Sequence, residues 1–504
     1  MGSAVKPILG IAAIVFAPVL APVLLGGIGV AATATAVAVA TAGIVLVGAS
    51  LVGSTTTDSM SSAVDTMSVE GYAGSKLQTI KSNTAPVPQV YGLHKMAGNI
   101  IWQDTNTAVN SNSATNGYNR DYWAVIILAG HEVEDINYMY AGETTMSTVG
   151  STADYKFETA YVHIKFYNSS ASARNIQSLD WVKNDSGATD TGSTLGLPSI
   201  VIPANTAFLL VHQAFDAEDN KNTALEAITV EVAGKLIRTI TNATTISTSK
   251  TYSTNPAEIL LDLLTTGLSV ADADIDIATF YQAKTDCTAN SWTCNIAIIQ
   301  QANIQSIIAD VLATCRGKIF HSESKWKCKI DTKSQSVADT LTSDDVLGNS
   351  LSISMAGSAT IANKMIVKYV NPSDDWLSAE SVKEDSTLQT YDGQTVQKIL
   401  DIKGVTSAAH AAELSEIALN SLRYSEDASA NRVKQTPLAI TFATSVKNAH
   451  LEVGDVISLN HTLLDRVRQF LLLSTMTDQS GVIQISAREY CETHFKNTSG
   501  VYLI

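Results

Sequence analysis

Hydrophobic residues are most concentrated near the start of the chain. The run from Pro7 to Thr57 contains no ionisable side chain. One membrane-crossing helix needs only about 20 apolar residues, so this run is long enough for two. Glycines at positions 26, 27 and 29 divide it. We therefore expect a membrane hairpin with arms Pro7–Leu25 and Val30–Val52.

The second arm of this run has two interpretations. β-Branched residues at positions 33, 35, 37, 39 and 41 alternate with alanines, which is the period of a strand. The sequence therefore leaves helix or strand open for residues 32–42. Lys6 is the only basic flank before Lys76, and no aromatic belt brackets either arm, which is atypical of a resident membrane protein.

We interpret the run as a segment that is stored inside an assembly and released onto a membrane. A permanent plug in an oligomer core and a conventional anchor or signal are the alternatives, although a signal peptide has an apolar core of only about 7–15 residues. Whether the segment enters an outer or an inner membrane stays open. The expected membrane-contacting residues are Ile8, Leu9, Ile14, Val15, Phe16, Leu20, Leu24, Leu25, Ile28, Ile44, Val45, Leu46, Leu51 and Val52.

Beyond a linker expected at residues 58–76, the pattern indicates strands as far as about residue 254. Buried or alternating apolar runs are bounded by Asn, Asp, Gly and Ser turns, which is typical of a β-rich fold. A polar loop is expected at 105–119. The expected strands lie around Val90–Tyr91, Asn99–Trp102, Trp123–Leu128, Ile136–Tyr140, and in the runs YVHIKFY, AFLLVHQAF and AITVEVAGKLI.

At Asn255 the period of the apolar residues changes from that of a strand to that of a helix. Asn255 is suited to cap the helix and Pro256 to its first position. Further helices are expected over Ile275–Cys287, Ile304–Cys315 and Ser407–Tyr424, and a hairpin in KIFHSESKWKCKID. The final expected strands are Ile366–Val370, Pro437–Phe442, Val456–Leu459, Phe470–Ser474 and Val482–Arg488.

Composition and charge narrow the possible functions. The 504 residues are 45% hydrophobic and 16% charged, and the formal net charge is −15. Affinity for nucleic acid comes mostly from clustered Lys and Arg, which this chain lacks, so the composition argues against a dedicated nucleic-acid binder. The five cysteines are odd in number and show no CxxC spacing, so we expect buried thiols, not a disulfide framework or a metal site.

Candidate chemistry in the sequence is weak. The acidic series Asp272, Asp274 and Asp276 resembles the start of a calcium loop, but Ile277 and Ala283 replace the Gly and Glu that the loop requires. The cluster around His131 lies in an expected hairpin turn and has no GxSxG nucleophile to act with. No phosphate-binding loop is present. We therefore expect no catalytic, cofactor-binding or metal-binding residue, and no enzymatic activity.

The order of several motifs resembles the central tail-tip (hub) protein of lambda-like siphophages, which is itself similar to the hubs of contractile tails. The segments that carry the resemblance are PVPQVYGLHKMAGNI, IILAGHEVEDINYMYAGE, NPAEILLDLLT, TCNIAI, IIADVLATCRGKIFHSESKWKCKID, TLTSDDVLGNSLSISMAG, NKMIVKYVNPSDDW, GVTSAAHAAELSEIALNSLRY and LEVGDVISL. They extend from about Leu77 to about His494. Each motif is weak alone, but their common order is specific.

The resemblance implies an α+β, mainly β fold with two hub-type β-barrels. The implied division is a hydrophobic segment (1–57), a linker (58–76), a first barrel (77–155, completed by about 225–254), an inserted β domain (156–224), an α/β subdomain (255–335) and a second barrel (336–504) with a helix at 407–424. The hydrophobic run is not part of the family pattern, and longer relatives continue beyond REYCETHF.

The implied function is that of a structural hub at the distal end of a virion tail, made in the host cytoplasm. It implies a homotrimer that contacts a distal tail ring, a tape-measure protein, tail fibres or receptor-binding proteins and accessory tip proteins, with the host membrane reached on infection and DNA met only in passage. The alternatives are a membrane-anchored or exported β-rich surface adhesin and a cell-wall hydrolase.

Overall fold

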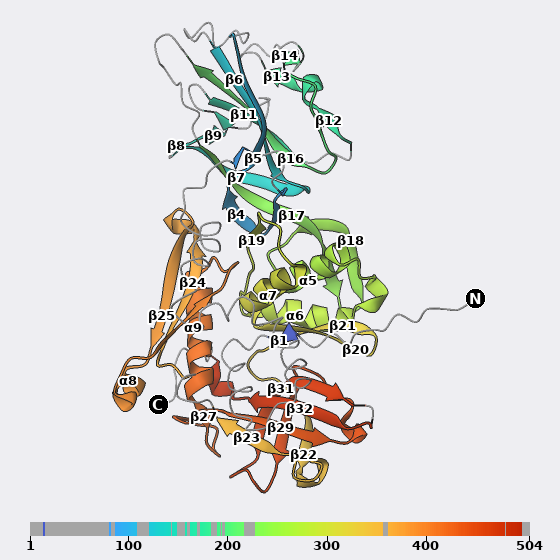
Figure 1. Ribbon diagram of the computed structural model, residues 1–504, viewed down its shortest axis with the longest axis vertical. Helices are drawn as coiled ribbons and strands as arrows, with labels where there is room; N and C mark the ends of the chain where they lie inside the picture. The colour runs from blue at the N-terminus through green and yellow to red at the C-terminus, as the bar shows by residue number, and fades with distance from the viewer. Residues whose placement is uncertain are drawn as a thin grey trace, which may run out of the picture.

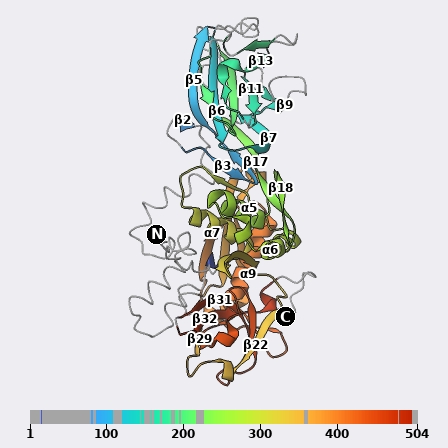
Figure 2. The ribbon, with the colours of Figure 1, turned by 90° about the vertical axis from the view of Figure 1, so that its right-hand side faces the viewer.

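The computed structural model describes residues 14–15, 80–81, 86–107, 120–142, 144–148, 157–158, 162–168, 172–182, 189–191, 193, 197–215, 227–355, 361–478 and 480–495. These residues form an elongated molecule with three successive parts (Figures 1 and 2). A first β region lies at one end, a helical part lies in the middle, and a second β region lies at the other end. The chain is therefore mainly β with an α/β centre.

The first β region contains two facing sheets. The seven-stranded sheet has the order β2-β5-β6-β16-β11-β10-β9, and the other sheet has the order β18-β17-β7-β8, with β4 also paired to β17. The bounds of these strands are β2 Ile80–Lys81, β4 Leu93–Met96, β5 Asn99–Thr107, β6 Arg120–Ala129, β7 Val133–Ala141, β8 Thr144–Thr145, β9 Ser147–Thr148, β10 Phe157–Glu158, β11 Val162–Tyr167, β16 Ala207–Phe215, β17 Ile228–Asn242 and β18 Thr245–Tyr252.

Strand β6 shows why the sequence here is a continuous run of apolar residues and not an alternation of apolar and polar ones. Its side chains point to opposite faces in turn. Ala124, Ile126 and Leu128 pack between the two sheets, while Trp123 and Val125 pack in a second core on the other face. Because both faces are buried, neither set of positions is polar. The pair of β12 (Arg174–Asn175) with β15 (Val201–Ile202) contributes Ile202 to this second core. A further short pair joins β13 (Asp180–Val182) to β14 (Thr189–Thr191).

The seven-stranded sheet crosses the boundary expected at residue 156. β16 pairs with β6 on one side and with β11 on the other, so strands of the stretch expected as an inserted domain share a sheet with the first barrel. The division into domains stays a prediction, and the sheet shows that these two stretches are joined by backbone hydrogen bonds.

The middle part forms around three helices, α5 (Pro256–Asp262), α6 (Ile277–Ala289) and α7 (Ile304–Cys315). Asn255 caps α5, since its side chain accepts a hydrogen bond from the Ala257 amide, and Pro256 occupies the first turn, as expected. α6 begins at Ile277, two residues later than expected, because Asp276 is its cap. Strand β19 (Ile296–Ile298) pairs with β3 (Gln89–Tyr91), and β20 (Gly317–Ser322) with β21 (Lys325–Ile330).

The second β region contains a six-stranded sheet of order β22-β30-β31-β32-β29-β23. Beside it, helix α9 (Ala408–Arg423) packs on a three-stranded sheet of order β25-β24-β26 (Figure 1). The remaining bounds are β22 Val337–Thr342, β23 Ser352–Met355, β24 Lys364–Asn371, β25 Leu377–Glu384, α8 Ser386–Asp392, β26 Gln397–Asp401, β27 Ser425–Glu426, β28 Arg432–Val433, β29 Leu438–Thr444, β30 Val456–Asn460, β31 Arg468–Thr477 and β32 Ile483–Glu489.

The expected strands and helices within the described residues are confirmed, with ends shifted by a few residues. β25, α8 and β26 were not expected. Of the apolar run, only the backbone of Ile14 and Val15 is described, as strand β1 paired antiparallel with β20. The hairpin expected at Pro7–Val52 and the linker at 58–76 otherwise lie outside the described residues. No helix in the described part of the chain is long and apolar enough to span a membrane.

Candidate functional site

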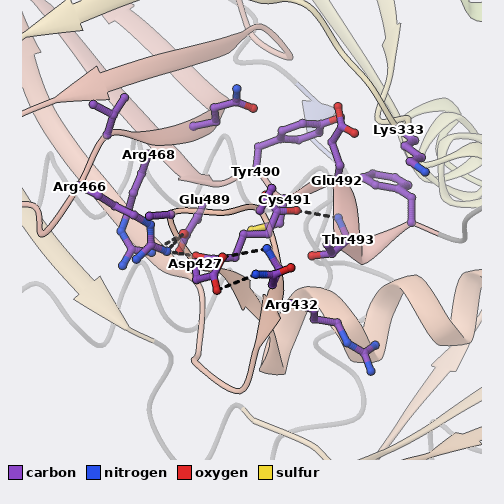
Figure 3. Close-up of a pocket in the computed structure, with 17 residues that line it drawn as sticks. Lys333, Asp427, Arg432, Arg466, Arg468, Glu489, Tyr490, Cys491, Glu492 and Thr493 are labelled. Carbon is purple, nitrogen blue, oxygen red and sulfur yellow. Dashed lines mark hydrogen bonds and ion pairs between the residues drawn. The ribbon is translucent and has the colours of Figure 1, made fainter. Parts of the chain in front are cut away.

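A polar cavity of about 540 Å³ opens at the C-terminal end of the second β region (Figure 3). Its walls come from the β27–β28 hairpin, from the start of β31, and from the residues that follow β32. Charged groups of both signs line it. The lining charged residues are Lys333, Glu426, Asp427, Arg432, Arg466, Arg468, Glu489 and Glu492.

The buried ion pair of Arg468 and Glu489 forms one wall of this cavity (Figure 3). Both carboxylate oxygens of Glu489 are occupied. Oε1 accepts from the Ser425 hydroxyl at 2.7 Å as well as from Arg468, and Oε2 accepts from the Leu438 amide at 2.9 Å. Because both of its oxygens already accept hydrogen bonds, this carboxylate stabilises the turn into β29 and is not available as a general base.

The rim of the cavity is held by contacts of the same kind. Asp427 accepts from the backbone amides of Ser429 and Asn431 at 2.8 and 2.9 Å, which closes the β27–β28 turn. The Arg432 guanidinium lies over the Tyr424 ring, 4.1 Å from its centre. Arg466 donates to the backbone carbonyl of Glu426. The rim charges are therefore used to fix the loop.

The groups that could act as nucleophiles in this cavity are unsuited to that role. Cys491 is buried, and burial raises the pKa of its thiol well above the usual value, so the thiol stays protonated. Burial likewise raises the pKa of Tyr490, whose hydroxyl donates to the Thr332 carbonyl at 2.9 Å. The geometry is that of a structural cleft between packed elements.

A second polar cluster lies where the β20–β21 hairpin meets the six-stranded sheet. Asp331 is 2% exposed and accepts from Arg316 at 2.5 Å and also from Arg488. Burial alone raises the pKa of the Asp331 carboxyl, but the positive charges around it outweigh burial and hold the pKa far below its usual range. Lys318 is 1% exposed beside it, and burial lowers the pKa of its ammonium group to about 8.

A third polar cluster joins the first β region to the helices. Asp262 of α5 accepts from the Tyr91 hydroxyl at 2.7 Å and from Lys235 at 2.6 Å. Close by, His131 accepts from the Val90 amide at 3.0 Å, and its other ring nitrogen donates to the Glu132 carbonyl. Burial lowers the pKa of His131 to about 4, so the ring is neutral at pH 7. His131 thus organises a turn, which agrees with the structural interpretation of this histidine.

The acidic series at 272–276 also has a structural role. Asp272 forms a bidentate ion pair with Arg238, at 2.7 and 2.8 Å, and Asp276 caps α6 through the Thr279 amide at 3.3 Å. Within the described residues, no three His, Cys, Asp or Glu side chains are grouped so that they could hold a metal ion. All five cysteines are buried free thiols, as expected.

The expected membrane-contacting residues lie outside the described residues, apart from the backbone of Ile14 and Val15. The structure therefore brings none of their side chains together. The cavity and the Asp331 cluster were not anticipated from the sequence. Their charged residues are scattered from position 316 to position 492, and no local pattern marks them as neighbours.

Part of the chain matches a known protein family. Residues 303–473 match a family model described as "Putative phage tail protein", so about a third of the chain carries the pattern of phage tail proteins. No curated protein sequence matches significantly.

Among solved structures, the chain is similar to one from the virion of a native gene transfer agent particle. The identity is 14% and the TM-score 0.52, over 87% of this chain and 92% of that chain, and this likeness shows a shared fold. A tail protein from Neisseria meningitidis MC58 matches at 10% identity and a TM-score of 0.30, over 79% of this chain and 96% of that one. The prophage tail protein gp18 from Listeria monocytogenes EGD-e matches at 8% identity and 0.27, over 77% and 87%.

Proposed function

We propose that this chain is the structural hub of a bacteriophage tail tip, a homotrimer that closes the tail tube, connects it to fibres or receptor-binding proteins and opens for DNA ejection. The observation that carries this proposal is the match of residues 303–473 to phage tail proteins. The fold shared with a virion chain over 87% of the sequence supports it. The two β regions then correspond to two hub-type barrels on either side of the α/β part.

The contacts of the charged residues in the described part of the chain suit a structural protein. Buried carboxylates in the cavity wall and at the subdomain junctions, those of Glu489, Asp331 and Asp262, are engaged in internal ion pairs, which fix elements against one another. The formal charge of −15 suits a chain that lines a passage for DNA, because an acidic surface repels the phosphate backbone. The proposed neighbours are the distal tail ring, the tape-measure protein, and fibres or accessory tip proteins.

The apolar run at Pro7–Thr57 is proposed to be stored near the tail axis in three copies and to enter the host membrane when the tip opens. Each buried methylene-sized group contributes about 0.8 kcal/mol to partition into hydrocarbon, so one arm supplies a large driving force. Its small-residue faces suit close packing between copies in storage and after insertion.

The location is tested by labelling this protein on virions and imaging them by negative stain. We expect label only at the distal end of the tail. Label elsewhere on the particle contradicts the hub, and label on the surface of the producing cell favours the adhesin alternative.

The membrane step is tested separately with charges placed in the two arms. Phe16→Asp with Val39→Asp should leave particles that adsorb but deliver little DNA, since each charge at the centre of a membrane helix costs about 2.5–3.5 kcal/mol. The matched control is Phe16→Ala with Val39→Ala, which shortens the same side chains without charge. Normal DNA delivery by the Asp variant, or by particles lacking Ile8–Val52, excludes insertion.

A further inference from the structure

The turn between β24 and β25 has an unusual backbone. Residues Asn371–Trp376 begin with a short 3₁₀ segment that Asn371 caps, and then reverse direction through Asp375 (φ 48°) and Trp376 (φ 62°). Neither residue is glycine, and the left-handed region is costly for residues with a side chain, most of all for bulky ones. Two such residues in succession persist only where the surroundings hold them.

Trp376 is held by the first β region. Although it sits in a turn, its side chain is only 5% exposed. Its indole nitrogen donates to Glu231 of β17 at 3.1 Å, and its ring centre lies 5.4 Å from that of His94 of β4. Glu231 is fixed in turn by the Tyr140 hydroxyl of β7 at 2.9 Å. We call the four residues His94, Lys95, Tyr140 and Glu231 the docking face.

Asp375, the neighbour of Trp376, supplies the charged part of the contact. Its carboxylate pairs with the ammonium group of Lys95, which also lies 4.1 Å above the centre of the Tyr140 ring. The Lys95 side chain is 8% exposed, whereas that of Asp375 is 74% exposed. Water and salt therefore reach this ion pair, and ionic strength weakens it.

Backbone pairing does not connect the two sides of this contact. β24 and β25 belong to a sheet with β26, while β4, β7 and β17 belong to another sheet. The ends of β24 and β25 reach the first β region beside β4 (Figure 1). Undocking the turn therefore breaks side-chain contacts and leaves every strand ladder complete. It also frees Asp375 and Trp376 to leave the left-handed region, which favours release.

We propose that the 371–376 turn is a releasable latch. Docked, it adds a contact between the first β region and the C-terminal part of the chain to the attachment that runs through the central helices. Released, it leaves the attachment through β3, β19 and α5 in place, and the first β region can tilt about it while both parts stay folded. This inference deepens the proposed function, on which it rests, by naming the contact that breaks when the tail tip opens.

The first test uses the purified full chain and amide hydrogen exchange. Trp376→Ala should speed exchange at residues 373–376 by about tenfold or more, with exchange in β4 and α9 unchanged, because the strand ladders stay complete. Tyr391→Ala is the matched control, because Tyr391 lies in α8, shortly after β25 in the chain, and is 82% exposed. Should Trp376→Ala fail to fold, Lys95→Met should give a smaller change at the same residues. Unchanged exchange, or equally fast exchange in α9, overturns the latch.

The second test locks the latch in assembled particles. Lys95→Cys with Asp375→Cys places two thiols where the ion pair was, and a bis-methanethiosulfonate reagent bridges them. The five native thiols are buried and do not compete. Crosslinked particles should adsorb normally, release their DNA at least about tenfold less, and recover with reductant. The two single-cysteine variants are the controls.

The outcomes of this second test separate the two proposals. Normal DNA release by fully crosslinked particles overturns the latch and leaves the hub standing. Absence of the protein from the tail tip overturns the hub instead.

Discussion

Replacing Asp331 by Asn should destabilise the C-terminal half of the molecule far more than its small size suggests. The change keeps the shape of the side chain but removes the one negative charge that accepts from both Arg316 and Arg488. Lys318, which is 1% exposed, lies in the same cluster. Removing one partner of a buried ion pair costs about 3–5 kcal/mol, because the remaining charges stay buried without compensation.

The matched control is Asp272→Asn. Asp272 also pairs with an arginine, Arg238, but the two side chains are 50% and 30% exposed, so water replaces much of the lost contact. A pair of this kind contributes about 0–1 kcal/mol. Both variants replace an aspartate that pairs with arginine, so they differ mainly in how deeply the ion pair is buried.

Thermal unfolding followed by circular dichroism measures the difference. For a cooperative unit of about 150–250 residues, 1 kcal/mol shifts Tm by about 2–4 °C, so Asp331→Asn should lower Tm by at least about 6 °C and Asp272→Asn by less than about 4 °C. Adding Lys318→Met to Asp331→Asn should recover part of the loss, since it removes one uncompensated cation. Equal losses for the two Asn variants refute the argument from burial.

The remaining predictions concern pH, an isolated buried charge and a helix cap. Burial lowers the pKa of His494 to about 4, below the ordinary value near 6.5. The unfolded chain therefore binds protons that the folded chain does not, and stability should fall as pH drops from about 6.5 to 4. His494→Gln, which keeps a donor for the Tyr424 carbonyl, should flatten that slope in urea titrations. Lys318→Met should raise stability at pH 7, because burial disfavours the ammonium group, which has no hydrogen-bond partner and which Met lacks. Since the pKa of Lys318 is about 8 when folded, wild-type stability should rise relative to this variant between pH 8 and about 10.4, checked by the same titrations. Asn255→Ala should cost about 1 kcal/mol, measured as a lower Tm, because the Ala257 amide loses its cap.

Most helices and strands could be predicted from the sequence because the residues that specify each one, its cap and its apolar pattern, lie within the element or next to it. Asn255 and Pro256 mark the start of α5 through capping alone. Helix α9 and the apolar strands β6, β16 and β31 show their period or their continuous run directly in the sequence. Strand β25 escaped because LSAESVKE has few β-branched residues and lies at the edge of its sheet, where packing supplies little pattern.

The end of α7 shows that nearby residues do not always predict the backbone conformation at a helix end. Gly317 follows this helix, yet the residue in the left-handed region is Arg316, with φ 55°. A Cβ atom at Gly317 would come within 2.7 Å of the Leu312 side chain and 3.0 Å of the Cys315 sulfur, so glycine at this position allows the elements to pack closely. The conformation of Arg316 is compensated by its ion pair with Asp331. That partner cannot be recognised from the sequence around the helix.

The candidate sites were hidden because their partners are distant in the chain. Asp331 and Arg488 are separated by 157 positions, and Trp376 and Glu231 by 145. Solvent-exposed and buried carboxylates look alike in a sequence, so Asp272 and Asp331 could be told apart only once the fold had placed them.

The strand order of the six-stranded sheet has a consequence for biosynthesis. β32 (Ile483–Glu489) lies in the interior of that sheet, between β31 and β29, while β22 begins at Val337. At about 5–20 residues per second, β22 leaves the ribosome roughly 7–30 s before β32 is made. During that time the strands already synthesised have no partner for their inner edges, and the bond from Arg488 to Asp331 cannot form. A shortened translation product that stops before β32 thus has this sheet divided into two pieces, β22-β30-β31 and β29-β23, without the strand that joins them.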